Sequence, residues 1–459
     1  MPTPHLLVIG GGFAGVAAAV SLRTHGADVT LIDNRPTLGG RARSDVLDGV
    51  MVDTGAQFVA SSFGRTLRLI NRARASSGAR AASADAAGVP AGLHATPGRD
   101  LLVREGVPHV LQYGSVRSLL GFGGLGAMEK MKLGAYLLPL LARYRGDLAA
   151  TADEVPASVD HESARTFVAS RVDDRSADVL VEPPLNSFYA TRGSEASLAF
   201  FLMLGRYGTE SALLAPIAGW SDLLTGALGD VAYIADTRIV SLDLPDAGGV
   251  LARAADGREW GGAGAVVATG PRTARELLAP HLVAHAPMLE WLGSVPLRPS
   301  WTLALVLDVP LRRDVFGVFP DVRTARTVSA CAIYGTKLGH TAPTERDVVL
   351  AWPTPDCAER LAGASSGVVT AAMLPEIEAV LPEVRGHVTR ARLYRFDEGT
   401  PIASPGFAAH RARGRELADQ LPLPIALAGD YLTAPLIEGA VASGERAAAR
   451  LLDVVRTGV

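Results

Sequence analysis

The chain has 459 residues, of which 48% are hydrophobic and 20% charged, and its formal net charge at pH 7 is -3. This length exceeds what a single core usually supports and predicts two domains. The nearly neutral charge provides no electrostatic footprint for nucleic acid or for an anionic membrane surface.

The two cysteines, Cys331 and Cys357, lie in neither a C-x-x-C nor a zinc-like spacing, so we expect packed free thiols in a reducing compartment. No apolar run is long enough to span a bilayer, and no charged leader precedes the first apolar segment. We therefore expect a cytoplasmic protein, and peripheral contact with the inner face of the membrane stays open. His281 and His285 lie four residues apart without a third ligand nearby, so no metal site is expected.

The first strong pattern is a glycine-rich turn between a strand and a helix. Residues 6–9 predict a strand, and G-x-G-x-x-G leads from it into a helix of small residues over 14–23. Gly10 permits a tight turn, Gly12 lets a pyrophosphate approach the backbone, and Gly15 lets helix and strand pack closely. This arrangement is typical of a dinucleotide site.

A second strand, residues 27–33, ends in Asp33, eighteen residues after Gly15. A carboxylate at that place can accept both ribose hydroxyls of an adenosine, while free amides at the helix N-terminus attract the phosphates. The dinucleotide contacts predicted from this segment are Gly10, Gly12, Phe13, Ala14, Gly15, Asp33 and Asn34.

Three further segments indicate which dinucleotide binds. The G-G-R of residues 39–41, followed by D-x-G-x-Q in residues 53–57, resembles the superfamily of flavin amine oxidases, protoporphyrinogen oxidases and phytoene desaturases. Residues 425–444, with A-G-D-Y and then E-G-A-V-x-S-G, are similar to the carboxy-terminal motif of phytoene desaturases. The resemblance implies noncovalent FAD, since no cysteine lies at a flavin-linking position. The FAD contacts that it adds are Gly40, Arg41, Ile239 in the strand 238–242, Asp430, Ile437 and Gly439.

The fold that this resemblance implies is α/β, with a discontinuous FAD-binding Rossmann-like domain and a mixed α+β substrate domain. We expect the FAD-binding domain in residues 1–72, 215–275 and 407–459, and the substrate-binding domain in residues 73–214 and 276–406. Along the chain, residues 61–71 predict a helix and residues 73–99 a surface loop without apolar period. Residues 250–254 and 265–269 predict a hairpin with its return strand, and residues 301–309, 327–334, 348–352 and 388–396 predict strands of a second sheet.

Residues 115–144 combine apolar runs with a few cations and allow two interpretations. One is an interfacial helix at a lipid-facing entrance, as in the resembled family. The other is a buried helix pair with Pro139 as a kink, and we favour it because core helices are equally apolar.

Three departures from the amine oxidases bear on the substrate. The strand of residues 300–307 lacks the lysine that bridges through water to flavin N5 in those enzymes, and Leu436 stands where they place one wall of an aromatic cage. The other wall falls near Gly399 or Thr400, and neither is aromatic. A cationic amine prefers an aromatic face, so these positions favour a neutral, lipophilic substrate of isoprenoid type. The predicted pocket residues are Gln57, Tyr189, Tyr334, Tyr431 and Leu436, and no residue is assigned as a catalytic base.

The resulting hypothesis is an FAD-dependent desaturase that transfers hydride to flavin N5 and is reoxidised by dioxygen or a quinone. A protoporphyrinogen-type oxidase is the alternative, suggested by the residues Glu182-Pro183 and Tyr189-Ala190, and a flavin amine oxidase is less favoured. The non-enzyme alternative is a prenyl-protein escort, which shares the fold but acts by binding. The motif of residues 438–440, together with Asp430, disfavours it.

Overall fold

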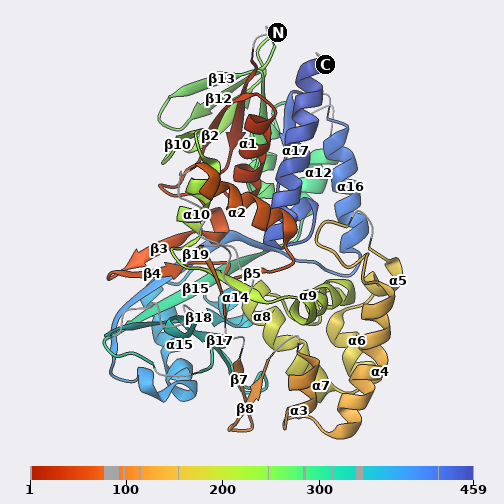
Figure 1. The fold of residues 1–459 in the computed structure, drawn as a ribbon, viewed down its shortest axis with the longest axis vertical. Helices are drawn as coiled ribbons and strands as arrows, with labels where there is room; N and C mark the ends of the chain where they lie inside the picture. The colour runs from red at the N-terminus through yellow and green to blue at the C-terminus, as the bar shows by residue number, and fades with distance from the viewer. Residues whose placement is uncertain are drawn as a thin grey trace.

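The computed structural model describes residues 3–76, 92–96, 99–112, 115–152, 155–246, 248–282, 286–311, 314–337, 345–421 and 423–457. The molecule is elongated, and both ends of the chain lie at the same end of it (Figure 1). A parallel sheet with its helices forms that end, and a second sheet and a group of helices form the other.

The parallel sheet has five strands drawn from three distant parts of the chain. Their order is β10 (Ala232–Ile234), β2 (Asp28–Ile32), β1 (His5–Ile9), β14 (Gly264–Val267) and β20 (Ile425–Leu427). Every pairing among them is parallel. This sheet confirms the expected α/β class, and its sequence-distant strands agree with a discontinuous nucleotide-binding unit.

Successive side chains of β1 point to opposite faces of the sheet, so Leu6 and Val8 enter one core and Leu7 and Ile9 another. The first core is covered by α1 (Phe13–Thr24), α2 (Gly64–Ser76), α10 (Trp220–Leu228) and α17 (Ile437–Thr457). The second lies under the antiparallel strands β11 (Ile239–Asp243), β12 (Val250–Ala254) and β13 (Glu259–Gly262), and under α11 (Pro271–Leu278), α12 (Ala286–Ser294) and α16 (Phe407–Asp419).

The second sheet has seven strands in the order β19 (Val388–Pro401), β15 (Leu297–Leu307), β18 (Asp347–Pro353), β17 (Val328–Ile333), β16 (Gly317–Phe319), β7 (Asp100–Arg104) and β8 (Val107–Leu111). Only β16 and β7 pair in parallel. One face packs on α14 (Pro355–Arg360) and α15 (Ser366–Val380). The other face contributes to a large apolar cluster with α4 (Ala127–Arg143), α6 (Ala164–Arg171), α7 (Asp174–Leu180), α8 (Glu182–Tyr189) and α9 (Leu198–Glu210). We call this set of side chains the helix-side cluster.

Short strands connect the two sheets. The pair β3 (Ser44–Leu47) and β4 (Val50–Asp53) is antiparallel, and β9 (Leu213–Pro216) pairs with both β5 (Val59–Ala60) and β6 (Leu93–Ala95). Two short helices, α3 (Val116–Gly121) and α13 (Tyr334–Lys337), follow β8 and β17, and α5 (Ala157–Asp160) precedes α6.

The structure departs from three sequence expectations. Strand β6 forms within residues 73–99, which were expected to be a loop, although residues 77–91 and 97–98 lie outside the described chain. Strand β12 pairs with β13, and the strand expected as its return partner instead joins the parallel sheet as β14. Periodicity alone missed these pairings because partner choice depends on contacts between distant segments.

The favoured interpretation of residues 115–144 is also wrong. Helix α3 has no buried residue, and α4 buries only Leu133 although it continues through Pro139. Leu120, Met128 and Met131 are 63%, 60% and 61% exposed. These helices lie on the outside of the substrate-side half. The apolar composition of the segment did not indicate this exposure.

Helices α1 and α17 bring the two ends of the chain together. A Cβ atom on Gly444 would lie 2.1 Å from the carbonyl oxygen of Ala14 and 3.1 Å from the Cβ of Ala17. Such distances leave no room for any side chain at this point of the helix pair. The small residues of α1 are therefore required by packing as well as by nucleotide binding.

The replacement Gly444→Ala should lower the free energy of unfolding by about 1–3 kcal/mol, because overpacking forces two helix backbones apart. Urea denaturation followed by circular dichroism measures the change. Gly134→Ala in α4 is the matched control, since its Cβ would meet only a Leu138 methyl group at 3.8 Å. That replacement should be neutral or should stabilise the protein by up to about 1 kcal/mol. Equal effects of the two replacements would contradict the packing argument.

Candidate functional site: a flavin site closed by the C-terminal helix

The glycine-rich turn after β1 has the shape that a pyrophosphate requires. Gly10 has a φ of 111°, and a Cβ on it would lie 2.6 Å from the carbonyl oxygen of Ala268. A Cβ on Gly15 would lie 1.8 Å from the carbonyl oxygen of Gly10. The Cβ position of Gly12 meets no atom within 4 Å. Packing thus demands Gly10 and Gly15, whereas Gly12 borders open space at the N-terminus of α1, beside Phe13 and Ala14.

The second glycine pair lies directly against this turn. The N–H of Gly39 donates to the carbonyl oxygen of Gly11 at 2.9 Å, and a Cβ on Gly40 would lie 3.2 Å from the Cα of Gly12. Gly39 and Gly40 have φ values of 120° and 55°, which side chains rarely adopt. The two motifs therefore form one backbone surface, although 24 residues separate Gly15 from Gly39 in the sequence.

Asp33 lies at the end of β2 beside this surface. Its carboxylate accepts the N–H of Gly11 at 2.5 Å and the N–H of Arg35 at 2.8 Å, which orients it toward the turn. Burial raises the pKa of Asp33 above its usual range, and the two backbone hydrogen bonds act in the opposite direction. Asn34 follows and is exposed. The carboxylate retains free acceptor positions for ribose hydroxyls.

Ile239 is placed next to Asp33 by the segment that precedes β11. The N–H of Thr237 donates to the carbonyl oxygen of Asp33 at 2.8 Å. The N–H of Asp33 donates to the carbonyl oxygen of Ile234 at 3.0 Å. Ile239 itself is buried against the core under β1 and β2. The adenosine end of the site is thus assembled from β2 and the start of β11.

Arg41 connects the second glycine pair to the last strand of the parallel sheet. Its guanidinium group donates to Asp430 at 2.7 Å and to the carbonyl oxygen of Gly399 at 2.8 Å. Asp430 lies three residues after the end of β20, and Gly399 lies in β19 of the second sheet. One arginine therefore joins both sheets and places a cation and a carboxylate side by side, the two groups predicted to contact the FAD.

The start of α17 completes the site. Ile437 packs against the same core as α1, and a Cβ on Gly439 would lie 2.4 Å from the carbonyl oxygen of Ala434. Between them, buried Glu438 accepts hydrogen bonds from the N–H groups of Arg65 and Thr66 at 2.9 Å and from the Thr66 hydroxyl at 2.7 Å. Glu438 therefore caps the start of α2. The sequence motif did not reveal this structural role.

Four of the five predicted substrate residues belong to the helix-side cluster, pack against it or adjoin it. Tyr334 belongs to the helix-side cluster, and Tyr189 and Leu436 pack against it. Gln57 adjoins it, because Phe58 packs there and the Gln57 amide contacts the neighbouring Lys337. Tyr431 lies apart in the core behind the parallel sheet, with its ring 6.1 Å from that of Trp291.

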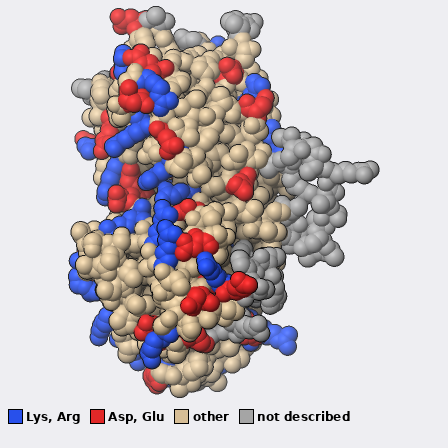
Figure 2. All heavy atoms as spheres, turned by 90° about the vertical axis from the view of Figure 1, so that its left-hand side faces the viewer, with Lys and Arg blue, Asp and Glu red and all other residues tan. Residues whose placement is uncertain are grey.

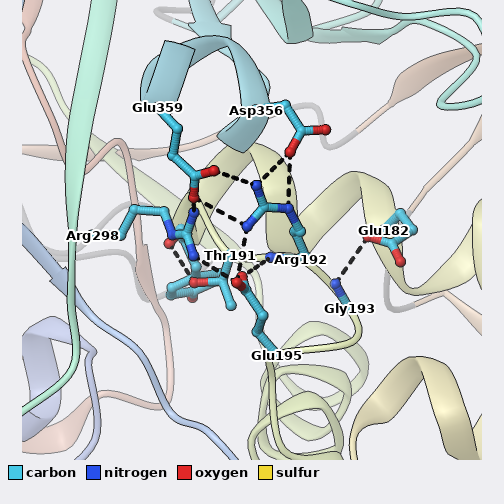
Figure 3. Close-up of polar contacts among 9 residues, drawn as sticks. Glu182, Thr191, Arg192, Gly193, Glu195, Arg298, Asp356 and Glu359 are labelled. Atoms are coloured by element: carbon cyan, nitrogen blue, oxygen red, sulfur yellow. Dashed lines mark hydrogen bonds and ion pairs between the residues drawn. The ribbon is translucent and has the colours of Figure 1, made fainter. Parts of the chain in front are cut away.

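A polar network fixes the helix that carries Tyr189. Buried Glu182 at the start of α8 accepts the N–H of Gly193 at 2.9 Å (Figure 3). Beyond it, Arg192 and Arg298 share the carboxylates of Glu195 and Glu359, as the close-up shows. These contacts tie the loop after α8 to β15 and α14. The Glu182-Pro183 similarity thus coincides with a structural function.

Sequence reasoning missed Lys337. Its side chain is completely buried, and its ammonium group donates to Asp53 and, at 2.8 Å, to Gln57. The only available signal was scarcity, since this lysine is one of three in the chain. Its position beside D-x-G-x-Q depends on the pairing of distant strands.

With this geometry established, the chain can be compared with known proteins. The family described as flavin containing amine oxidoreductase matches residues 13–452. The chain belongs to this family. The flavin cofactor and the flavin oxidoreductase class expected from the sequence are thereby confirmed. The open space at Gly12 and the Arg41 guanidinium group are compatible with a bound dinucleotide.

Individual relatives of this flavin oxidoreductase match it only locally in sequence. Polyamine oxidase 3 of Oryza sativa subsp. japonica is 46% identical over 57 residues, which are 12% of each protein. Hydroxyneurosporene desaturase of Rubrivivax gelatinosus is 43% identical over 53 residues, 12% of this chain and 10% of the desaturase. Cyclohexylamine oxidase from Brevibacterium oxydans IH-35A has a similar fold, with a TM-score of 0.70 and 14% identity over 99% of this chain and 100% of that enzyme. At that identity the likeness concerns the fold alone.

Within the described residues, no group of three His, Cys, Asp or Glu side chains could hold a metal ion, and His285 lies outside them. Cys331 and Cys357 are free and buried. Noncovalent attachment of the flavin stays a prediction, together with the individual FAD contacts.

FAD affinity should depend on the ionisation of Asp33. Ribose hydroxyls donate to the ionised carboxylate, and the raised pKa means that protonation removes this acceptor at a higher pH than for an ordinary aspartate. We therefore expect FAD release to begin earlier on acidification than an unperturbed carboxylate would allow. Flavin fluorescence measured between pH 4 and pH 8 follows the release.

In this titration, Asp33→Asn should weaken FAD binding about tenfold or more at neutral pH, because charged hydrogen bonds contribute roughly 1.5–3 kcal/mol. It should also remove the acid dependence. Asp28→Asn at the start of β2 is the control, since Asp28 is exposed. An unchanged acid profile in Asp33→Asn would contradict the assignment.

Proposed function

We propose that the protein is an FAD-dependent dehydrogenase that desaturates a neutral, lipophilic substrate of isoprenoid type. The observation that carries this proposal is Leu436 at the start of the flavin-side helix α17, an aliphatic side chain that packs against the helix-side cluster. Ala304 and Val306, on strand β15, are buried members of the same cluster. Such surroundings favour a hydrocarbon over a cationic amine, whose desolvation would require a paired partner.

Strand β15 supports this reading of the substrate side. Ala304 and Val306 face the helix-side cluster, whereas Trp301 faces α14 and α15, with the Arg395 guanidinium group 4.5 Å from its ring centre. Thr302 lies on the same face as Ala304 by alternation and is fully buried. The strand that carries the flavin-bridging lysine in amine oxidases therefore presents a hydroxyl and two aliphatic groups here.

In this reaction the bound flavin supplies the hydride acceptor. The protein's own residues orient the substrate and exclude water from it. Burial raises the pKa of Tyr189 and Tyr334, so both phenols stay protonated at neutral pH and can donate hydrogen bonds. They are therefore unsuited to accept the proton that the substrate loses together with the hydride, so that proton passes to a base other than these two phenols.

A protoporphyrinogen-type oxidase is the second candidate. Its main support was the Glu182-Pro183 and Tyr189-Ala190 similarity, and Glu182 has a sufficient structural reason in its contacts with Arg165 and the Gly193 N–H. An amine oxidase remains the third candidate.

Anaerobic reduction of the flavin separates these candidates. Purified yellow protein is mixed with squalene-type, carotenoid-type, porphyrinogen and amine substrates, and the flavin absorbance is followed. We expect bleaching by an isoprenoid substrate, and reoxidation by dioxygen or a quinone, each added in turn. Bleaching by amines alone would contradict the proposal, and a colourless protein without extractable FAD would favour an escort that acts by binding.

We also propose that the substrate enters from an anionic membrane surface, at the end of the molecule formed by β8, α3 and α4 (Figure 1). Eight large apolar side chains are exposed there, namely Val107, Val110, Val116, Leu120, Met128, Met131, Tyr136 and Leu138. No helix in the described part of the chain is long and apolar enough to cross a bilayer. Contact would therefore be made from one side of the membrane.

The charges of this end support an anionic lipid as its partner. Residues 115–144 carry four cations and the single acid Glu129, whose carboxylate accepts the N–H of Gly126. Elsewhere, on the side seen in Figure 2, acidic and basic residues are interspersed. The inner side of α4 packs against the helix-side cluster through Leu137, Leu140 and Leu141. Helix α4 thus lies between the exposed apolar end and the region proposed for the substrate.

Vesicle sedimentation tests this surface. The protein should sediment with phosphatidylglycerol vesicles and bind phosphatidylcholine vesicles more weakly. The double variant Met128→Ser/Met131→Ser should lose at least about tenfold in affinity, because two apolar side chains no longer leave water. Val240→Ser, at another exposed apolar position, is the control. Absence of vesicle binding would contradict the proposal. Self-association of the wild-type protein that the same double variant abolishes would also contradict it, because the apolar end would then bind a second copy of the chain.

A further inference from the structure

The buried pair of Lys337 and Asp53 lies between the two sheets. Both side chains are completely inaccessible to solvent. The Lys337 ammonium group also donates to Gln57 at 2.8 Å and lies 4.9 Å from the ring centre of Tyr334 and 5.4 Å from that of Phe58. The Tyr334 hydroxyl in turn donates to Asp53 at 3.3 Å. Two of the predicted pocket residues, Gln57 and Tyr334, thus surround this cation together with Phe58.

The Asp53 carboxylate also connects this pair to the flavin side by hydrogen bonds. Asp53 accepts the hydroxyl of Ser44 at 2.5 Å, and the Ser44 hydroxyl accepts the N–H of Trp220 at 2.7 Å, at the start of α10. The next residue, Ser221, donates to the carbonyl oxygen of Leu38 at 2.8 Å. Leu38 immediately precedes Gly39-Gly40-Arg41. A continuous buried network therefore connects Lys337 to the second glycine pair.

Backbone contacts join these groups by a second route. A Cβ on Gly55 would lie 1.9 Å from the carbonyl oxygen of Arg41, and the N–H of Ala56 donates to that oxygen at 3.2 Å. The Gln57 amide donates to the carbonyl oxygens of Asp53 and Gly55 at 2.9 and 2.7 Å. Any displacement of the 53–58 segment would therefore also displace Arg41.

Stability alone does not account for such a pair. Replacing a buried ion pair by apolar residues is often neutral or stabilising, because both charges must be removed from water. Burial accordingly lowers the pKa of Lys337, while Asp53 acts in the opposite direction. What the pair does provide is directional contacts that set the position of Gln57, Phe58 and Tyr334.

We propose that Lys337 is a positioning residue that couples the flavin-binding segment 39–41 to the substrate wall formed by Gln57, Phe58 and Tyr334. It acts through Asp53 and has no contact with the reacting atoms. The inference rests on the proposed flavin-dependent reaction but not on the identity of its substrate.

The wild-type protein offers a direct test, because Lys130, Lys132 and Lys337 are its three lysines. Protein labelled with ¹³C and ¹⁵N in lysine alone should give three side-chain signals, one of them from a buried ammonium group. FAD binding, and reduction of bound FAD with dithionite, should shift the Lys337 signal and leave Lys130 and Lys132 unchanged. A Lys337 signal that is the same in the FAD-free, oxidised and reduced proteins would overturn the proposal.

Variants supply a second test. Lys337→Met leaves Asp53 buried without its cation and is expected to unfold readily, so the informative variant is Lys337→Met/Asp53→Asn, which removes both charges. It should fold and bind FAD, yet change the circular dichroism of the flavin bands and slow anaerobic flavin reduction at least tenfold. Arg23→Met/Asp230→Asn, which removes an exposed pair, is the matched control.

The outcomes separate the two proposals. If no lipophilic substrate reduces the wild-type flavin, the proposed substrate is wrong, while the lysine spectra and flavin dichroism still test Lys337. If the double variant shows wild-type dichroism and reduction rate, Lys337 has no positioning role. Should the double variant fail to fold, the lysine spectra of the wild-type protein decide the question.

Discussion

The close contact of helices α1 and α17 is the constraint on which the rest of the structure depends. Gly444 leaves no space for a side chain against the Ala14 carbonyl group, so the last helix must lie on the first. This contact brings the end of β20 to the parallel sheet and Asp430 within reach of Arg41. The nucleotide site is therefore closed by residues from opposite ends of the chain.

Arg41 extends this closure to the second sheet. By contacting both Asp430 and the backbone of Gly399, it fixes the end of β19 relative to the glycine turn. The pairing of β15 with β19 is irregular between Arg298 and Ser300, where the extra residues lie in β19 and include Gly399. A Cβ on Gly399 would lie 2.3 Å from the backbone nitrogen of Ser300. The second sheet is thus positioned against the glycine turn by backbone geometry and a single cation.

The buried charges and the apolar surroundings of the site complement each other. A hydrocarbon offers no hydrogen bonds, so a protein that orients it must rely on the shape of its wall. In the proposal made above, part of that wall is held in position by Lys337, Asp53 and Gln57. Helix α8 is held by Glu182 and by the network of Arg192 and Arg298. The polar groups hold neighbouring side chains in position, while the apolar groups face the region proposed for the substrate.

The sequence by itself determined the nucleotide half of the protein. Gly10, Gly12, Gly15 and Asp33 lie within a single strand-turn-helix-strand unit, whose local geometry follows from glycine stereochemistry and short-range hydrogen bonds. Strand β12 likewise has the residues that the sequence predicted, because its apolar alternation matches its buried face. The family resemblance further linked residues 39–41 and 430–439 to one cofactor.

Tertiary structure alone decided the rest. Composition made residues 115–144 resemble a core helix pair, and only the packing of neighbouring helices determined that their apolar side chains face outward. Lys337 and Asp53 are 284 residues apart, and no local pattern relates them. Their contact arises from the packing of β4, at whose end Asp53 lies, against α13, which carries Lys337, and long-range burial governs that packing. Long-range packing likewise places Tyr431 in the core behind the parallel sheet, apart from the other predicted pocket residues.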